Sequence, residues 1–456
     1  MLSKKRYISS IPFGTPFASR DIATIRIALL SATVHDGPVA HRELKDEDIL
    51  FRKQLQRVFE LLAPLHEVGC VRDAAGNREL HYDDYCKLVL LYTWNPLIAS
   101  VHDLQQAVGL PKVAKALGVK RFSAGSFSES VRVFDPEMLK PIICELAGQL
   151  PQTQDPRLAE LKQALTLVDG TVIRGLTRLA KTAGGLGDDG LSANRYNTTR
   201  DGRGVYGWRL HTQLDLKTFT PVRLDRTGAR NAGKSRESNM LRSTLQPNLC
   251  YVGDGGLNDR SLFDDITDVQ SSYVIRLAEN SVFELVEERP LSAAAVEAGV
   301  VRDAIVHLPG AKHPVRRVEV KVEPHPRRAR AGFREVDRII LATNYLDLPA
   351  ELIALIYRYR YTVELFFRVL KQLLGLRHLL SQRDEGLDIQ IYCTLIVCIL
   401  IQLISGKKPT KGMRNIVGWY LLGLADAADV VAFLNKPDNT GVKLRAKEAL
   451  WKKMGF

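Results

Sequence analysis

Four polar residues in the last quarter of the chain have types and spacing that could act on a phosphate ester. They are Tyr357, Arg360, Glu364 and Lys371. On one continuous helix these positions share a stripe about 60° wide. Such a stripe presents one carboxylate that can bind a metal ion, with phosphate-binding groups on either side. The alternative, which spacing alone favours, is a solvated face on which Arg360 and Glu364 form an ordinary i,i+4 ion pair.

Asp169 lies within a run of residues that predicts a β-strand, between the segments 165–168 and 170–173. Aspartate is disfavoured in strands, and a carboxylate at the edge of a core is costly unless it is paired, hydrogen-bonded or bound to metal. This position is therefore a candidate metal ligand. The alternative is a tight turn, in which Asp169 and Gly170 join two short strands of a hairpin.

Asp254 follows a second predicted strand, residues 249–253, and precedes Gly255 and Gly256. The carboxyl end of a strand in an α/β sheet is a frequent ligand site, and the glycines allow close approach. The alternative is a loop aspartate that caps the following helix. Four more acids come soon afterwards in a helical pattern and are interpreted as solvated: Asp259, Asp264, Asp265 and Asp268.

The elements that must position these acids change character along the chain. Up to about residue 150, apolar residues at helical spacing predict helices over 52–67, 82–94 and 134–150. From residue 165 the pattern predicts three strands, a helix, a strand and a helix: 165–168, 206–216, 221–226, 235–245, 249–252 and 258–266. Residues 272–344 are β-rich. A long helix follows over 351–374, with Gly375 as its cap, and another over 388–404.

The β-rich segment carries a local basic excess, because residues 312–338 contain nine Lys or Arg against four acids. Arg327, Arg328 and Arg330 form its densest part. The excess fits either a solvated strand face or a surface that contacts phosphates. The whole chain of 456 residues has 64 basic and 51 acidic side chains, a net charge of +13. This charge attracts polyanions such as nucleic acid, although it also suits simple solubility.

Several other classes of protein are disfavoured. The six cysteines form no C-x-x-C pair, so neither a zinc site nor a disulfide framework is expected. This pattern fits a protein of the reducing cytoplasm. The longest apolar run, 391–405, is short for a membrane span of about 20 residues and predicts a buried helix. The glycine-rich segment 184–190 lacks the Lys-Ser/Thr of a phosphate-binding loop, so no nucleotide cofactor is expected.

The spacing from Tyr357 to Lys371 resembles the Y-(2)-R-(3)-E-(6)-K signature of DDE transposases of the insertion-sequence-4 type. Residues 168–171 and 252–256 resemble that family's two aspartate segments. Residues 207–211, Gly-Trp-Arg-Leu-His, resemble the strand between them, with Arg209 in place of the usual lysine. The resemblance covers roughly residues 120–405.

The resemblance implies an α/β fold: a ribonuclease-H-like mixed sheet with helices, interrupted by a β-rich insertion, plus a helical N-terminal module. The expected division is a DNA-binding module over 1–150, a catalytic domain over 160–271 and 345–405, the insertion over 272–344, and a helical C-terminal segment over 406–456. The insertion accounts for the 110 residues that separate Asp254 from Glu364.

The resemblance also implies the chemistry. Asp169, Asp254 and Glu364 would be the catalytic acids and would bind two Mg²⁺ ions, for which Mn²⁺ can substitute. The DNA-binding residues would be Tyr357, Arg360 and Lys371, together with Arg327, Arg328 and Arg330. The reaction would be cleavage of double-stranded DNA at element ends, followed by attack of the freed 3′-hydroxyl on target DNA.

Two alternatives stay open: a ribonuclease-H-like nuclease without strand transfer, and a catalytically inactive DNA-binding relative. By the same analogy the chain would act as a homodimer on DNA, in the bacterial cytoplasm at the nucleoid, without a membrane. Relatives that cut through a DNA hairpin hold a flipped base against an aromatic ring of the insertion. No Trp lies between residues 271 and 344, which leaves Tyr273 and Phe283 as candidates for that contact.

Overall fold

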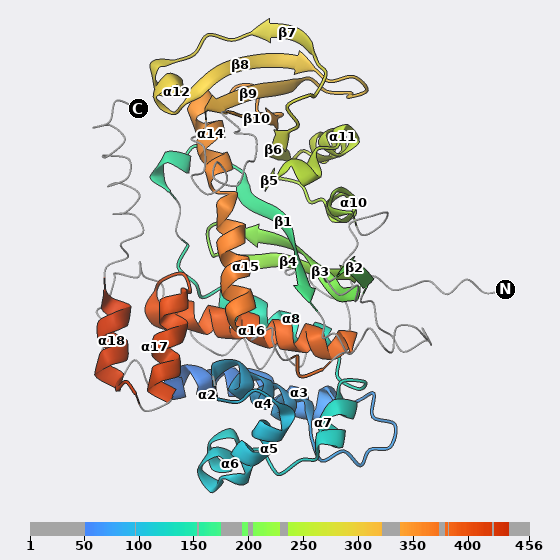
Figure 1. Ribbon diagram of the computed structural model, residues 1–456, viewed down its shortest axis with the longest axis vertical. Helices are drawn as coiled ribbons and strands as arrows, with labels where there is room; N and C mark the ends of the chain where they lie inside the picture. The colour runs from blue at the N-terminus through green and yellow to red at the C-terminus, as the bar shows by residue number, and fades with distance from the viewer. Residues whose placement is uncertain are drawn as a thin grey trace, which may run out of the picture.

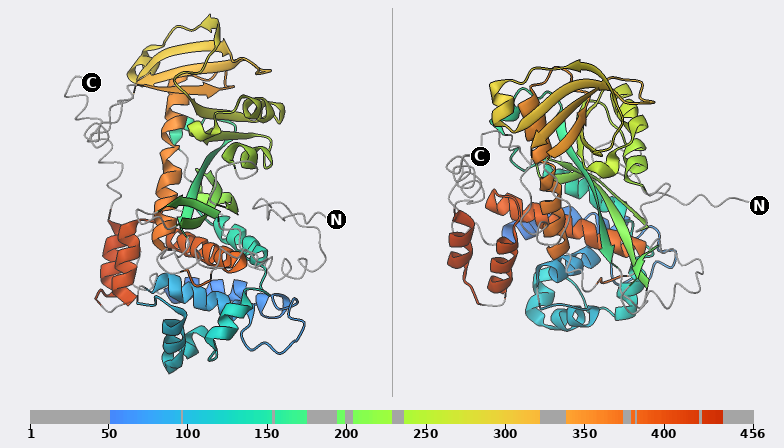
Figure 2. Two further views of the ribbon diagram at one scale, coloured as in Figure 1. Left: turned by 45° about the vertical axis from the view of Figure 1, so that its right-hand side comes forward. Right: turned by 45° about the horizontal axis from the view of Figure 1, so that its top comes forward.

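The computed structural model describes residues 51–95, 97–152, 155–174, 194–198, 204–228, 236–321, 338–373, 379–381, 383–421 and 424–436. Figure 1 shows strands β7 to β10 at one end of the molecule, strands β1 to β4 in the middle and the N-terminal helices at the other end. The two further views in Figure 2 preserve this order.

The N-terminal region is helical, as the sequence predicts. Its α-helices are α2 (Phe51–Leu62), α3 (Leu65–Val68), α4 (Tyr82–Trp94), α5 (Val101–Gly109), α6 (Pro111–Leu117), α7 (Ala124–Ser130) and α8 (Lys140–Ala147). The helix predicted over 52–67 is broken at Pro64, which has no N–H to continue the ladder. Short 3₁₀ turns, η1 (Pro136–Leu139) and η2 (Pro156–Leu158), begin with prolines behind aspartate caps.

Ten strands form one mixed sheet, in which β1 (Ala164–Arg174) lies between β3 and β5. On one side β1 pairs antiparallel with β3 (Gly204–Asp215), which in turn pairs with β4 (Thr220–Gly228) and β2 (Asn194–Thr198). On the other side lie β5 (Leu249–Gly253) and β6 (Ser272–Leu277), both parallel to β1. Three antiparallel strands followed by two parallel ones are the ribonuclease-H-like order, so the predicted fold class is confirmed.

The insertion extends this sheet instead of forming a separate one. The expected segment 272–344 begins with β6, which pairs in parallel with β5. The rest of the segment contains β7 (Glu284–Glu288), α12 (Ala293–Glu297), β8 (Val300–His307), β9 (Val315–Lys321) and β10 (Arg338–Thr343). β10 pairs antiparallel with β6, and β9, β8 and β7 follow in order. The pairing satisfies the backbone groups of β6 that would otherwise lie at an open edge.

Helices pack on both faces of the sheet, and the sheet separates two apolar cores. Leu167 of β1 belongs to a core shared with α15 (Tyr361–Leu373), including Val363 and Phe366. The next residue, Val168, points to the opposite core, which includes Leu241 of α10 (Glu237–Arg242) and Phe263 of α11 (Arg260–Asp268). Because strand side chains alternate, Asp169 lies on the α15 face and Gly170 on the α10 face.

The predicted continuous helix from residue 351 is wrong. The structure has α14 (Ala350–Arg358) and α15 as separate helices stacked end to end, as Figure 1 shows. Between them the N–H groups of Tyr359, Arg360 and Thr362 donate to carbonyls three residues back, at 3.1, 3.0 and 2.8 Å. These i→i+3 bonds tighten the chain into a 3₁₀-like turn, which alters the rotation between α14 and α15.

One helix, α16 (Asp384–Ser405), is long and apolar enough to cross a membrane, but 89% of its most apolar window is buried inside the protein. It packs between the sheet and the N-terminal helices, where it contacts α4 and α8. Its first turn is tied to the sheet, because Trp208 donates to Asp384 at 3.0 Å and Arg226 pairs with Asp388 at 2.7 Å. Two further helices follow, α17 (Lys411–Leu421) and α18 (Ala427–Asn435).

Candidate active site

The sheet register places Asp169 and Asp254 at neighbouring positions. Val168 of β1 is the parallel partner of Gly253 of β5, and each aspartate is the next residue in its strand direction. Asp169 is inside a continuous strand, opposite Thr212 of β3. The alternative of a hairpin turn at Asp169 and Gly170 is therefore wrong. Asp254 lies beyond the end of β5, as expected for a ligand site at the carboxyl edge of parallel strands.

Both aspartates are held by the backbone that follows them. The N–H of Gly170 donates to Asp169 Oδ1 at 2.7 Å, and the N–H of Gly255 donates to Asp254 Oδ1 at 2.7 Å. Asp254 also caps the short turn η5 (Gly255–Leu257). The capping interpretation of Asp254 thus holds together with its position beside Asp169. In each case one carboxylate oxygen is fixed, which orients the side chain.

Arg360 links the helix-borne acid to the sheet. Its Nη2 donates to Glu364 Oε1 at 2.5 Å, and its Nη1 lies 3.9 Å from Asp169 Oδ2. Burial alone would lower the pKa of Arg360, but the bond to Glu364 and the nearby charge of Asp254 raise it above its ordinary value. Three acids from β1, the β5 turn and α15 therefore surround one guanidinium.

The buried position of Asp169 makes its negative charge costly. Burial raises the pKa of Asp169 to about 6, the Gly170 N–H bond opposes this, and the charges of Glu237 and Asp254 add to it. The Arg360 guanidinium lowers the pKa only in part. A further positive charge at the site would stabilise the ionised form of a carboxyl group in such surroundings.

This shift predicts a pH-dependent stability difference. The folded state holds the Asp169 proton more tightly than the unfolded state. Protonation of Asp169 therefore stabilises the folded state fully below about pH 4, and this contribution is lost as pH rises through about 6. In the presence of a chelator, Asp169→Asn should therefore gain stability relative to the wild type by about 1–1.5 kcal/mol between pH 5 and pH 7.5. Urea unfolding at both pH values measures this, with the exposed Glu279→Gln as control. A constant difference would contradict the burial argument.

Tyr357 and Lys371 flank the acids along α14 and α15. Burial and the Asp254 carboxylate raise the pKa of Tyr357 to about 12, so its hydroxyl is a hydrogen-bond donor at neutral pH. Lys371 lies seven residues after Glu364 on α15, about 10 Å farther along the helix axis. Because the helix breaks before Tyr361, the single-stripe geometry holds for Glu364 and Lys371 but not for Tyr357. The i,i+4 ion pair predicted as the alternative also forms.

Glu237 is an acid of this region that sequence reasoning did not single out. It begins α10, and its Oε1 accepts from Arg209 Nη1 at 2.7 Å. Its charge acts on Asp169. An acid at the start of a short helix has no distinctive spacing. The signal for Arg209 in the sequence is its place in the segment 207–211, where the resembled family usually has a lysine.

The basic residues of the segment 312–338 are less available to phosphates than its composition indicated. Arg327, Arg328 and Arg330 lie outside the described residues. Of the described cations, Arg316 pairs with Asp303 at 2.7 Å, while Arg317 and Arg338 pair with Glu319 at 3.0 and 2.9 Å. This part of the excess is therefore largely neutralised within the sheet.

The two aromatic candidates for holding a flipped base differ in exposure. Tyr273 is 1% exposed and stacks on Phe263, with the ring centroids 4.6 Å apart, so it is not available to DNA in this structure. Phe283 is half-buried, with the Arg317 guanidinium 4.3 Å from its ring centroid. The expectation that Tyr273 could hold a flipped base is therefore wrong for this structure. Phe283 stays a candidate for that contact, because part of its ring surface is exposed.

The donor set of the three acids fits a hard divalent cation, which prefers carboxylate oxygens. Within the described ranges, the group of three or more possible ligands whose atoms all lie within 4.8 Å is a different one: His66, Asp83 and Asp84. There Lys87 Nζ already bonds both aspartates, at 2.8 and 2.9 Å. Asp169, Asp254 and Glu364 are spaced more widely, around Arg360.

Comparison with known proteins identifies the family. Residues 160–400 match the family described as the transposase DDE domain. The putative transposase y4zB of Sinorhizobium fredii (strain NBRC 101917 / NGR234) is 27% identical over 235 residues, which are 51% of this chain and 64% of that protein, less than two thirds of its length. A solved piggyBac transposase synaptic complex with hairpin DNA aligns with 90% of this chain and 85% of that chain, at 10% identity and a TM-score of 0.43. The family match spans more than half of the chain and includes all three acids, and the chain therefore belongs to the DDE transposase domain family.

Proposed function

We propose that this chain is a transposase of the insertion-sequence-4 type that cleaves double-stranded DNA at element ends and joins the freed 3′-hydroxyl to target DNA. The observation that carries the proposal is the convergence on Arg360, whose guanidinium contacts Asp169 and Glu364 and is charge-coupled to Asp254. These acids are separated by up to 195 positions in the sequence. Chance ion pairing gives no reason for the two aspartates to meet at adjacent strand positions with the glutamate on the helix that packs above them.

Divalent metal ions, which DDE transposases generally use, activate the attacking oxygen and stabilise the leaving oxygen when bound. Asp169, Asp254 and Glu364 would hold them. The backbone bonds from Gly170 and Gly255 keep the two aspartates oriented before substrate arrives. This orientation lowers the cost of assembling the site.

The cationic and phenolic groups would act on the DNA strand. The Arg360 guanidinium is 16% exposed, so it can reach a phosphate oxygen while it stays beside Glu364. The neutral hydroxyl of Tyr357 can donate to an oxygen of the DNA end. Lys371 would bind phosphates farther along the strand, because it lies about two helical turns beyond Glu364 on the same face.

A strand-joining assay tests the proposal. The substrate is a labelled duplex made from the DNA that flanks the gene on each side, searched first for short inverted repeats, and it is mixed with Mg²⁺ and a supercoiled plasmid. Label joined covalently to the plasmid supports the transposase. Cleavage without joining would instead indicate a nuclease of the same fold, and binding with neither product would indicate an inactive relative. A direct duplication bordering those repeats in the genome would independently support transposition.

The basic segment beyond β9 supplies a separate prediction about DNA binding. Replacing Arg327, Arg328 and Arg330 by Ala should reduce the slope of log K against log salt by about 2–3, because each lost phosphate contact removes about 0.9 from it. Filter binding from 50 to 300 mM KCl measures the slope. The matched control is Arg157→Ala, because Arg157 is 64% exposed and paired with Asp155 at 2.7 Å, and it should leave both the fold and the slope unchanged. An unchanged slope in the triple variant would assign the segment to a solvated face.

A further inference from the structure

Glu237 occupies a place between the two backbones that carry Asp169 and Asp254. A Cβ atom added to Gly170 would lie 2.4 Å from Glu237 Oε1, and one added to Gly256 would lie 3.1 Å from Oε2. Gly170 directly follows Asp169, and Gly256 is two residues after Asp254. The two oxygens of one carboxylate thus border both aspartate segments, on the face of β1 opposite α15.

The carboxylate is fixed in this position by Arg209. Arg209 Nη1 donates to Glu237 Oε1 at 2.7 Å, and the two side chains are only 17% and 13% exposed. Arg209 stands on β3 opposite Val172 of β1, so the pair reaches from the sheet to the helix. A charge-assisted bond in this partly buried place is stronger than one at the surface.

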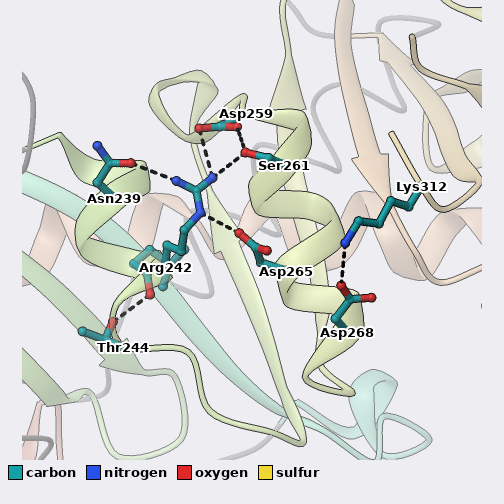
Figure 3. A network of polar contacts seen from close by, with 9 residues as sticks. Asn239, Arg242, Thr244, Asp259, Ser261, Asp265, Asp268 and Lys312 are labelled. Carbon is teal, nitrogen blue, oxygen red and sulfur yellow. Dashed lines mark hydrogen bonds and ion pairs between the residues drawn. The ribbon is translucent and has the colours of Figure 1, made fainter. Parts of the chain in front are cut away.

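The far end of α10 is fastened as well. Figure 3 shows Arg242 at the centre of a polar network that reaches α11. Its guanidinium donates to Asp265 at 2.5 Å, Ser261 at 2.7 Å and Asp259 at 3.4 Å, and also to Asn239 of its own helix at 2.9 Å. Because α11 directly follows the Asp254 turn, the network fixes α10 relative to that turn. Glu237 therefore has a defined position with respect to both β1 and β5.

We propose that Glu237, held by Arg209, is a positioning residue that sets the spacing and the charge of the Asp169–Asp254 pair for divalent cations. This inference rests on the proposed function, because it assumes that these aspartates bind metal. The carboxylate acts through the backbones of Gly170 and Gly256, which it keeps apart. It also adds a negative charge behind the aspartates, which favours an incoming cation.

The first test measures Mn²⁺ affinity by calorimetry on the full chain without DNA. Glu237→Gln keeps the size of the side chain and an oxygen that can accept from Arg209, but it removes the charge. We expect the Kd for Mn²⁺ to rise about tenfold, as is typical when an outer-shell partner of a metal site is lost. The exposed Glu279→Gln should leave the Kd unchanged. A Kd for Glu237→Gln within twofold of the wild type, or a rise that Glu279→Gln shares, would overturn the inference.

The second test uses the close contact with Gly170 and is independent of metal. Gly170→Ala should lower the melting temperature, since its new Cβ meets Glu237 Oε1 at 2.4 Å. In a Glu237→Ala background the same change should cost much less, because the obstructing carboxylate is gone. Equal losses in both backgrounds would show that Glu237 does not press on this backbone, contrary to the inference. If wild-type protein binds no Mn²⁺, the proposed function fails, whereas the coupling between positions 170 and 237 can still be measured.

Discussion

Asp169→Asn, Asp254→Asn and Glu364→Gln should each lower Mg²⁺-dependent cleavage and strand joining by at least about 10³-fold, equivalent to about 4 kcal/mol of transition-state stabilisation. Each substitution removes one negative charge but keeps nearly the same volume. The three side chains approach one guanidinium from three different elements, so the loss of any one would leave the proposed cation site incomplete. The labelled-duplex assay with a plasmid target gives the measurement.

The matched control is Asp268→Asn on α11, an exposed acid that is hydrogen-bonded to Lys312 and His313 at the surface. It should cleave and join DNA like the wild type. All four variants should still shift labelled DNA in a gel, since phosphate binding depends on cations elsewhere. Wild-type joining by Glu364→Gln would mean that the helix-borne acid has been assigned wrongly.

The second large effect concerns the attachment of α16 to the sheet. Arg226 of β4 is 10% exposed and pairs with Asp388 at 2.7 Å and with Asp384 at 3.0 Å. Arg226→Ala leaves two poorly solvated carboxylates without their cation, so it should destabilise the protein by about 3–5 kcal/mol. Urea unfolding followed by tryptophan fluorescence measures the loss, because Trp208 itself donates to Asp384.

The control for this prediction is an exposed pair. Arg132 and Glu129 form an ion pair at 2.9 Å in which both side chains are more than half exposed. Arg132→Ala should therefore change the free energy of unfolding by no more than about 1 kcal/mol. If Arg226→Ala were equally mild, the carboxylates of α16 would have to be well solvated, contrary to their burial. Replacing Arg226, Asp384 and Asp388 together by apolar residues should recover part of the stability.

Local sequence patterns located most of the secondary structure near the site. The alternation of apolar residues over 206–216 and 221–226 indicated β3 and β4, and the short run at 249–252 indicated β5. The pattern of apolar residues was least informative where residues close in the sequence do not determine the secondary structure. β2 was not expected, and β8 lies in the segment 272–344 that was predicted to be β-rich but was not itself located. The break before Tyr361 also escaped prediction, since no Gly or Pro marks it.

For the site, too, some features follow from residue type and spacing and others depend on the fold. Residue types and spacing identify which side chains are available: two aspartates tied to strands, one glutamate on a helix, and basic groups at fixed offsets from it. Residue type and near-neighbour spacing are properties of the chain, and they do not depend on folding. They left open whether Asp169 was a ligand or a turn, and whether Glu364 was a catalytic acid or half of a surface ion pair.

The three-dimensional arrangement excludes the turn at Asp169, and it shows that Glu364 forms the ion pair with Arg360 at a place close to Asp169. The parallel pairing of β1 with β5 puts Asp169 beside Asp254, and the packing of α15 on the same face brings Arg360 and Glu364 to them. This arrangement also places the Glu237 carboxylate in the space that side chains at positions 170 and 256 would enter. Strand register and helix packing are set by burial of two apolar cores, built from residues far apart along the chain. The surroundings of an acid, and hence its charge state and its partners, therefore cannot be read from its sequence neighbours.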